Sequence, residues 1–264
     1  DVVIRKPGPD MAEPYRTSRG TTPGDDGYTG VENLEVMAEA VNYNRYLVNL
    51  IIANRHAGDA TVDFGAGAGT FAGPASESGL MLTCVEPDDH LREVLARKGL
   101  TAVADIQAVA TESIDYLYTL NVLEHIEDDQ GALNELARVL RPGGRLLVYV
   151  PAFQVLFTSM DRKVGHHRRY RLGGLTDKIR AAGFSVREAR YADALGFGAS
   201  LVYRAFDRGD GQVDRRGLRL YDRYCFPISL WLDRVFGRLF GKNAIVVAEK
   251  PVVPSGAVAG QERT

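Results

Sequence analysis

Three glycines alternate with small residues at the end of an apolar run in the first third of the chain. The segment is Thr61-Val-Asp-Phe-Gly-Ala-Gly-Ala-Gly-Thr-Phe71, and it predicts a buried strand, a tight turn and the start of a helix. Glycine has no Cβ, so its backbone adopts positive φ and lets a ligand approach closely. The following helix directs unpaired N–H groups toward that ligand. The segment therefore predicts nucleotide-type binding, and a tight turn without a ligand is the alternative.

Two ligand classes compete for this turn. Dinucleotide-binding folds use glycine at the first, third and sixth positions, but the sixth position counted from Gly65 is Thr70. An acid, Asp63, stands two residues before the first of the three glycines. This arrangement resembles motif I of the class I S-adenosylmethionine-dependent methyltransferases. The resemblance assigns these residues to cofactor binding: Asp63, Phe64, Gly65, Ala66, Gly67 and Gly69.

Two further acids follow the next strands of the pattern. Glu86 ends a strand predicted over 81–85 and lies 21 residues after Gly65. In nucleoside-binding α/β sheets an acid at this position accepts hydrogen bonds from both ribose hydroxyls, so Glu86 and Pro87 are predicted to contact the cofactor. Asp105 resembles the acid that this family places at the adenine edge, with Ile106 beside the ring. The alternative for Glu86 is an acid in a surface loop, and the alternative for Asp105 is a helix cap.

A third motif follows the strand predicted over 114–120. The segment Asn121-Val-Leu-Glu-His-Ile126 closely resembles the family motif at the end of the fourth strand. The resemblance implies that Asn121, Val122 and His125 face the cofactor and that Glu124 lines the acceptor pocket. Together with Arg141-Pro-Gly-Gly144, the match covers roughly residues 60–150.

A basic, aromatic loop is predicted over 151–171, after the fifth strand. Its Gly-His-His-Arg-Arg-Tyr run, 165–170, resembles a subgroup of bacterial methyltransferases. Ligands of open α/β sheets bind outside the carboxyl ends of the strands, and a neutral imidazole near pH 7 suits proton removal. His166, His167 and Tyr170 are therefore the candidate catalytic residues, with a solvated basic loop as the alternative. The predicted acceptor-pocket residues are Tyr28, Tyr43, Asn44, Glu124, Phe153 and Arg168.

Signatures of several other chemistries are absent from the sequence. The five histidines lack His-x-x-x-His or Cys/His ligand spacing, so we predict no metal site. A net charge of −2 does not indicate nucleic-acid binding. The only cysteines, Cys84 and Cys225, are far apart, which favours a reducing compartment over a disulfide framework. Without a leader or a long apolar run, we expect a cytoplasmic protein with no stable membrane insertion.

The elements that must position these residues alternate between strand and helix. Repeated βα units predict a doubly wound, Rossmann-like α/β fold, and the resemblance implies seven strands with an antiparallel last one. The predicted strands are 60–64, 81–85, 101–103, 114–120, 145–150, 184–191 and 244–249. The predicted units are a flexible arm (1–30), a helical cap (31–55), the methyltransferase core (56–191), a helical insertion (192–242), the last core strand (243–251) and a tail (252–264).

The insertion has four alternative roles. Its aromatic residues suit a roof over an apolar acceptor, a homodimer contact or ordinary core packing. The stretch 226–240 is also amphipathic and carries Arg234 and Arg238, which suggests contact with a membrane surface.

The sequence leads to one main hypothesis of function. The chain is expected to transfer a methyl group from S-adenosylmethionine by in-line displacement to a small molecule, either an apolar or aromatic natural product or a sugar or lipid-linked sugar. A non-catalytic protein of the same fold that binds S-adenosylmethionine or a nucleotide is the alternative.

Overall fold

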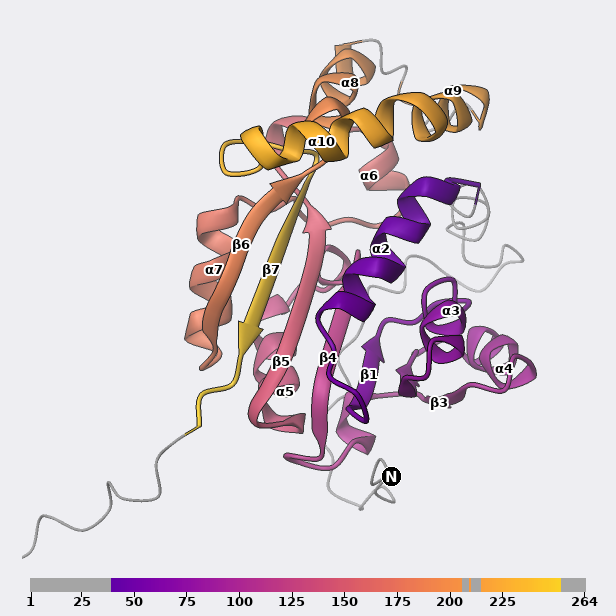
Figure 1. The fold of residues 1–264 in the computed structure, drawn as a ribbon, viewed down its shortest axis with the longest axis vertical. Coiled ribbons are helices and arrows are strands. Elements are labelled where there is room, and N and C mark those ends of the chain that lie inside the picture. Colours follow the sequence, from indigo (N-terminus) through magenta and orange to yellow (C-terminus); the bar gives the residue numbers. More distant parts are fainter. Residues whose placement is uncertain (1–38, 206–208, 210–214, 253–264) are drawn as a thin grey trace, which may run out of the picture.

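A single seven-stranded sheet forms the centre of the molecule (Figure 1). The computed structural model describes residues 39–205, 209 and 215–252. The strand order is β3-β2-β1-β4-β5-β7-β6, and β7 alone runs antiparallel to its neighbours. The fold prediction is therefore confirmed. The strands are β1 (Ala60–Phe64), β2 (Met81–Val85), β3 (Thr101–Val103), β4 (Ile114–Leu120), β5 (Leu140–Pro151), β6 (Ser185–Ala192) and β7 (Asn243–Glu249).

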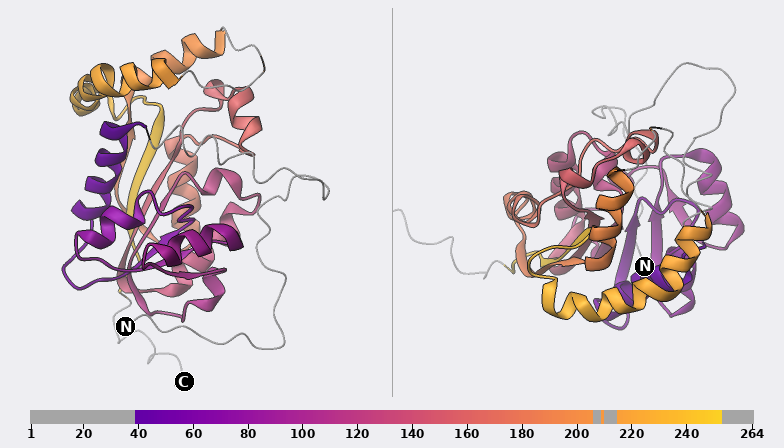
Figure 2. Two further views of the ribbon diagram at one scale, coloured as in Figure 1. Left: turned by 90° about the vertical axis from the view of Figure 1, so that its right-hand side faces the viewer. Right: turned by 90° about the horizontal axis from the view of Figure 1, so that it is seen from above.

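Helices cover both faces of this sheet and one of its ends (Figures 1 and 2). One face carries α2 (Val41–Ala53), α3 (Ala72–Glu77) and α4 (Asp89–Arg97), and the other carries α5 (Asp129–Val139) and α7 (Leu172–Ala181). The end where the parallel strands finish is covered by α8 (Ala194–Ala205), α9 (Arg215–Leu220) and α10 (Phe226–Phe236). The short elements are α6 (Ser159–Lys163), the 3₁₀ turns η1 (Ile106–Ala108), η2 (Leu123–His125) and η3 (Gln154–Leu156), and the π-helical turn η4 (Tyr221–Cys225).

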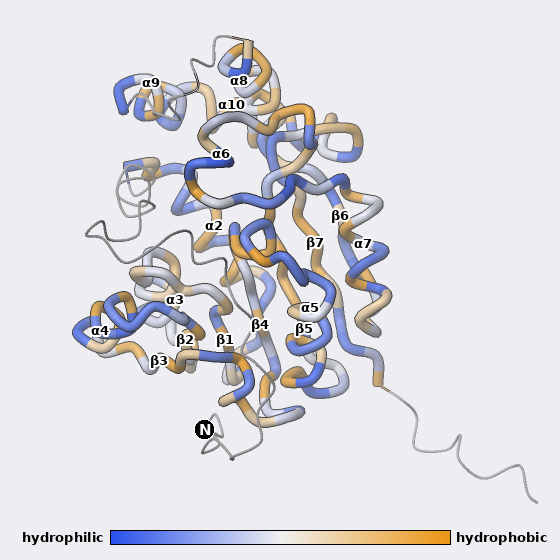
Figure 3. The backbone as a smooth tube through the Cα atoms, turned by 180° about the vertical axis from the view of Figure 1, so that it is seen from behind, coloured by the Kyte–Doolittle hydropathy of each residue, from blue (hydrophilic) through white to orange (hydrophobic). Residues whose placement is uncertain are grey.

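The core lies in two apolar layers, one on each face of the sheet. Leu133 and Leu136 of α5 pack with Leu117 and Val148 of the sheet on one face. Leu47 and other α2 residues pack with alternate residues of β4 and β5 on the opposite face. Figure 3 accordingly shows hydrophilic stretches along the outer helices α4 and α5. This burial on both faces is what a doubly wound sheet requires, because strands alternate their side chains between the faces.

Two local differences from the sequence prediction concern β5 and the loop after it. The strand begins at Leu140, directly after α5, and Arg141 to Gly144 form an irregularity where Ile114 pairs with Leu140 but Tyr116 pairs with Arg145. The segment predicted as a loop over 151–171 contains η3 and α6. A capping box between Thr158 and Asp161 stabilises the first turn of α6, a local effect that the basic composition of this segment obscured.

A long-range contact fixes α2 against the helices above the sheet. The carboxylate of Asp222 accepts hydrogen bonds from the backbone N–H groups of Asn42 and Tyr43, at 2.9 and 2.8 Å. It therefore supplies the N-terminal cap that the neighbouring Ala40 has no side chain to provide. The predicted arm, the first part of the predicted cap and Tyr28 lie outside the described residues.

Cys84 and Cys225 are both free thiols. Among the helices that the structure describes, none combines the length and apolar character needed to cross a bilayer.

Candidate functional site

The carboxyl ends of β4, β5 and β6 each lead into a residue with strained backbone geometry. Asn121 follows β4 with φ 55°, Phe153 follows β5 with φ 59°, and Asp193 follows β6 with φ 63°. Left-handed conformations are unfavourable for residues other than glycine, above all for a bulky one such as phenylalanine. Because such residues cluster at ligand sites, this edge of the sheet is the candidate functional site.

The glycine-rich turn lies at the same edge, after β1. A Cβ added to Gly65 would lie 2.3 Å from Cγ2 of Val122, so only glycine allows this close approach. Gly67 has a φ of 55°, but a Cβ there would meet nothing within 4 Å. The first glycine is thus required by packing against the loop after β4. The second borders open space in which a ligand has room.

Glu86 lies beside this turn and is held by backbone groups from two loops. Its carboxylate accepts hydrogen bonds from the N–H of Gly67 at 2.8 Å and the N–H of Asp88 at 3.0 Å, one on each oxygen. The residue is only 7% exposed. Burial raises the pKa of Glu86, and the two backbone hydrogen bonds oppose that rise. The carboxylate is therefore fixed in orientation, and each oxygen has a further lone pair for a ligand hydroxyl.

Asp63 is buried at the end of β1 behind the turn. Its carboxylate accepts a hydrogen bond of 3.0 Å from the hydroxyl of Tyr118. Burial raises the pKa of Asp63 to about 7, despite the Tyr118 hydrogen bond, and the nearby Glu86 adds to the rise. Desolvation thus dominates at this carboxyl.

Asp105 and Ile106 lie at the end of β3, as the resemblance implied. The Asp105 side chain accepts a hydrogen bond of 2.8 Å from the N–H of Gln107 and so caps η1. Ile106 is buried in the main core cluster. Both residues have structural roles here, and their contact with an adenine ring stays a prediction.

Tyr43 and Asn121 meet between α2 and the end of β4. The amide of Asn121 donates to the Tyr43 hydroxyl at 3.5 Å. The Tyr43 ring packs edge-on against Tyr149 and Phe226, and burial raises its pKa to about 12. Its neighbour Asn44 lies half-buried on the same helix. The cap helix therefore contributes directly to the edge that carries Asn121.

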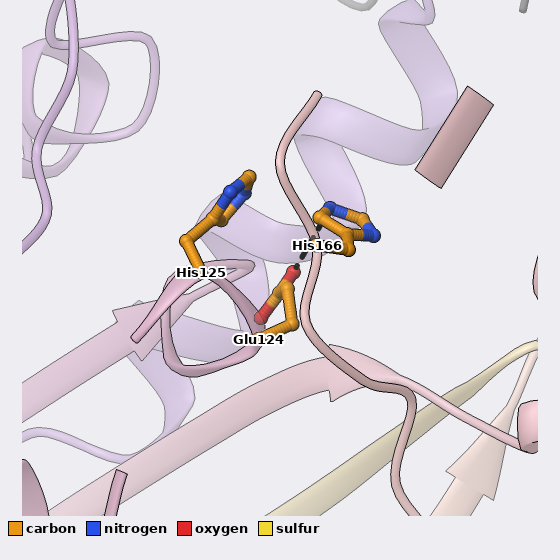
Figure 4. Close-up of side chains that lie close together, drawn as sticks. All are labelled: Glu124, His125 and His166. Carbon is orange, nitrogen blue, oxygen red and sulfur yellow. Dashed lines mark ion pairs between the residues drawn. The ribbon is translucent and has the colours of Figure 1, made fainter. Parts of the chain in front are cut away.

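Glu124, His125 and His166 form a compact cluster (Figure 4). The first two belong to η2, and the third follows α6. The rings of His125 and His166 pack edge-on with centroids 4.5 Å apart, and Nε2 of His166 lies 3.9 Å from Oε1 of Glu124. Burial raises the pKa of Glu124 to about 8 and lowers that of His125 to about 4.

Asp161 fixes the orientation of His166 from behind. Its Oδ1 lies 2.7 Å from Nδ1 of His166, and Arg169 donates to both carboxylate oxygens at 2.9 Å. Burial alone would raise the pKa of Asp161, but the hydrogen bonds from His166 and Arg169 outweigh it and hold that pKa well below its usual range. As a result, Nε2 of His166 is directed toward Glu124.

The other residues of the basic loop are engaged elsewhere. His167 is exposed, and its backbone N–H donates to the carbonyl of Glu124 at 2.8 Å. The Tyr170 hydroxyl is buried and bonds to Asp129 at 2.8 Å; burial and that carboxylate raise its pKa. Arg168 pairs with the same Asp129 at 2.8 Å. These contacts favour structural roles for Tyr170 and Arg168. Of the two adjacent histidines, His166 and His167, it is His166 whose side chain faces the candidate site.

Aromatic side chains line the far end of this edge. The ring of Phe153 stacks on Tyr191 at 4.6 Å and meets Phe197 of α8 edge-on at 5.3 Å. The predicted pocket residue Phe153 therefore joins the loop after β5 to the helices above the sheet.

One grouping was missed by reasoning from sequence. Spacing rules for metal ligands compare residues close in the chain, whereas His166 lies 41 positions after His125. The two meet because the loop after α6 folds back over η2, where the N–H of His167 reaches the carbonyl of Glu124. The Asp161–His166 spacing of five residues is the only local signal.

The family model and one of the relatives that match the chain are described as methyltransferases. A family model described as a methyltransferase domain matches residues 62–148. An uncharacterized methyltransferase of Mycobacterium tuberculosis is 29% identical over 187 residues, which cover 67% of this chain and 70% of the relative. A 37.1 kDa uncharacterized protein from a transposon of Streptomyces fradiae is 30% identical over 199 residues, covering 71% of this chain and 56% of its own length.

Solved structures share the fold at low sequence identity. An S-adenosylmethionine-dependent methyltransferase of Thermotoga maritima superposes with a TM-score of 0.55 at 18% identity, covering 84% of this chain and 97% of that one. A phosphoethanolamine N-methyltransferase of Haemonchus contortus, solved with S-adenosylhomocysteine, gives a TM-score of 0.56 at 17% identity and covers 85% and 58% of the two chains.

Proposed function

Because the chain belongs to the class I S-adenosylmethionine-dependent methyltransferases, we propose that it transfers the methyl group of S-adenosylmethionine to a small-molecule acceptor. The observation that carries the proposal is the carboxylate of Glu86. It is held by backbone N–H groups from two loops, next to a glycine turn that borders open space. A ribose presents two neighbouring hydroxyls, and a carboxylate fixed in this way accepts one on each oxygen.

The residues at the edge fit the remaining parts of this cofactor. Gly67 borders open space in which a ligand could approach the backbone, and Asp105 retains an acceptor oxygen beyond the one that caps η1. Asn121, in a left-handed conformation at the end of β4, would face the methionine part. When bound, S-adenosylmethionine supplies an electrophilic methyl group on a sulfonium, and alignment of an acceptor with it contributes roughly 7–11 kcal/mol to catalysis.

The acceptor would lie on the side of β4 and β5. The bound cofactor would supply its methyl group to an acceptor oxygen, nitrogen or carbon and leave as S-adenosylhomocysteine, and the displaced acceptor proton would pass to solvent. The aromatic set around Phe153 and the buried polar cluster around Glu124 both lie on this side. These neighbours favour an acceptor with an apolar body and one polar reacting group. The helices α8 and α10, which belong to the insertion predicted over 192–242, would roof it.

Calorimetric titration tests the cofactor assignment. We expect S-adenosylmethionine and S-adenosylhomocysteine to bind, with NAD and ATP at least about a hundredfold weaker. Glu86→Ala should weaken S-adenosylmethionine binding by at least about tenfold, equivalent to about 1.4 kcal/mol. The exposed Glu93 of α4 provides the matched control, and Glu93→Ala should bind like the unaltered protein. Binding of NAD alone, or unchanged affinity in Glu86→Ala, would contradict the assignment.

A further inference from the structure

The cluster of Glu124, His125 and His166 contains a buried carboxyl group, that of Glu124, which the described residues leave unsatisfied. Glu124 is 0% exposed. Neither carboxylate oxygen has a hydrogen-bond partner of good geometry among the described residues, and only its own backbone N–H favours the charged form from close by. Arg169 contributes at longer range, but two of its three side-chain nitrogens donate to Asp161, and the third, Nη1, has no hydrogen-bond partner in the described part of the chain. Buried carboxylates are normally paired or bound to a metal ion.

The two histidines are placed as ligands would be. One ligand atom from each of the three residues lies within 4.8 Å of the others, so a single ion would reach all three after small side-chain adjustments. Figure 4 shows both rings beside the carboxylate, with His166 approaching from the opposite loop.

The His166 ring is also held in place by a neighbouring carboxylate. Asp161 binds Nδ1 of His166 at 2.7 Å. Burial lowers the pKa of the His125 ring, and the nearby backbone of Val164 and Gly165 opposes that change. Metal-binding histidines usually bind a carboxylate or a backbone carbonyl through their second ring nitrogen, which fixes the ring for coordination. The cluster therefore has supporting contacts as well as ligand atoms.

We propose that Glu124, His125 and His166 bind one divalent transition-metal ion. Two imidazoles and one carboxylate suit Zn²⁺, Mn²⁺, Fe²⁺ or Co²⁺ better than Mg²⁺ or Ca²⁺. Three protein ligands leave coordination positions open for an acceptor.

An acceptor hydroxyl bound at an open position would lose its proton to water more readily, and its oxygen would then take the methyl group. This use of the ion rests on the proposed function, whereas metal binding itself does not.

Direct binding of metal tests the site without any assay of activity. The full chain is treated with a chelator, dialysed and titrated with Co²⁺ by visible absorption and with Zn²⁺ by calorimetry. We expect one equivalent of each, with affinity lowered at least about tenfold in Glu124→Gln and in His166→Gln. His167→Gln removes an exposed imidazole beside the cluster and should bind metal like the unaltered protein.

The titration has clear contrary outcomes. Less than stoichiometric binding by the unaltered protein, or equal affinity in Glu124→Gln, His166→Gln and His167→Gln, would overturn the metal site. Circular dichroism and S-adenosylmethionine titration of each variant show whether it is folded. Loss of metal binding in a folded variant that keeps S-adenosylmethionine affinity supports the site, even if the methyltransferase proposal fails.

An independent observation concerns the outer face of the helices above the sheet. α9, η4 and α10 follow one another across the top of the molecule (Figures 1 and 2). Large apolar side chains recur every three or four residues along these elements and the turn that follows α10, and each is between 56% and 68% exposed. This outer stripe comprises Leu220, Tyr224, Ile228, Trp231, Val235 and Leu239. Its spacing places these side chains along one side of a helix.

The charges that accompany the outer stripe are basic. Arg223, Arg234 and Arg238 are exposed. The two acids of this segment are occupied inward, since Asp222 caps α2 and Asp233 accepts from the N–H groups of Asp193 and Ala194. An exposed apolar stripe flanked by arginines complements an anionic lipid surface.

We infer that the outer stripe lies on an anionic bilayer, with its apolar side chains at the level of the headgroups and the helix parallel to the membrane. Sedimentation with vesicles tests this. Binding should be stronger to phosphatidylcholine vesicles that contain phosphatidylglycerol than to pure phosphatidylcholine, and it should weaken with salt.

Trp231→Ser combined with Val235→Ser should reduce vesicle binding at least about tenfold, because apolar burial contributes to interfacial affinity. Met81→Ser, a half-exposed apolar residue on β2, is the control. Absence of binding to anionic vesicles would overturn the inference. So would a homodimer in analytical centrifugation that the double variant dissociates, because the stripe would then face a second copy.

Discussion

Two buried acids at the strand-end edge are held in different ways: Glu86, in the half proposed to bind the cofactor, and Asp161, in the half proposed to bind the acceptor. In the cofactor half, after β1, β2 and β3, Glu86 is bound by the backbone N–H groups of nearby loops. In the acceptor half, after β4 and β5, Asp161 is bound largely by side chains, and Glu124 has no comparable partner in the described chain. Backbone groups hold the Glu86 carboxylate in place whatever side chains their own residues carry. The anchoring of Glu86 in the proposed cofactor half is therefore independent of neighbouring side chains, whereas that of Asp161 depends on them.

The largest contrast is expected from matched Asp→Asn substitutions in the two halves. Asp161→Asn leaves Arg169 and His166 without their buried anion, and we expect it to lower the free energy of unfolding by about 3–5 kcal/mol. Asp88→Asn in the cofactor half changes a helix cap that accepts from Leu91, where asparagine serves equally well, so less than about 0.5 kcal/mol is expected. Urea unfolding measures both. Similar losses in the two variants would refute the distinction between the halves.

A smaller effect is expected where the halves touch. Gly65→Ala places a Cβ against Val122 at a φ of 83°, so strain and overpacking together should cost roughly 2–4 kcal/mol. Gly58 has the same φ, but a Cβ there meets nothing within 4 Å. Gly58→Ala should therefore cost only about 1 kcal/mol. If the two alanine variants unfold at the same urea concentration, contact with Val122 is not what requires glycine.

The smallest effect concerns the pH dependence of stability in the cofactor half. The folded chain holds a proton on Asp63 up to a pH of about 7, whereas the ordinary pKa is 3.8. The folded state thus binds more protons than the unfolded state between these values, and its stability falls as pH rises through this window. Asp63→Asn lacks this titration and should gain on the unaltered protein by about 1 kcal/mol or more between pH 5 and 8.

Urea unfolding of both proteins at pH 5 and pH 8 measures that gain. Asp89→Asn, a change at an exposed acid of α4, is the control and should show little pH-dependent difference. A stability difference between Asp63→Asn and the unaltered protein that is independent of pH would show that Asp63 is ionised in the fold at neutral pH.

Much of the fold was predictable because its signals are local. The apolar runs and glycine turns of β1 and β2 depend on neighbouring residues, and the order of βα units determines the doubly wound sheet. Two local features of the fold were not predicted, because local interactions outweighed the composition of the segments in which they occur. The capping box at Thr158 adds α6 within a segment of loop-like composition, and Arg141 to Gly144 form an irregular part of β5 rather than a separate turn.

The same distinction between local and long-range contacts applies to the residues of the candidate site. Glu86, Gly65 and Asn121 were predicted from motifs in which position along the chain fixes position in space. The roles of Tyr170 and Arg168 were not predictable, because both depend on Asp129, about 40 residues earlier. Likewise, the meeting of His125 with His166 depends on the path of the loop after α6. Contacts between residues that are distant in the chain cannot be predicted from the spacing of residues in the sequence.

The most direct test of the account is a crystal structure of the chain with S-adenosylhomocysteine. The account predicts both ribose hydroxyls within hydrogen-bonding distance of the Glu86 carboxylate, the glycine turn against the ligand, and the sulfur directed toward Asn121 and Glu124. A ligand bound elsewhere, or one whose ribose does not contact Glu86, would contradict it.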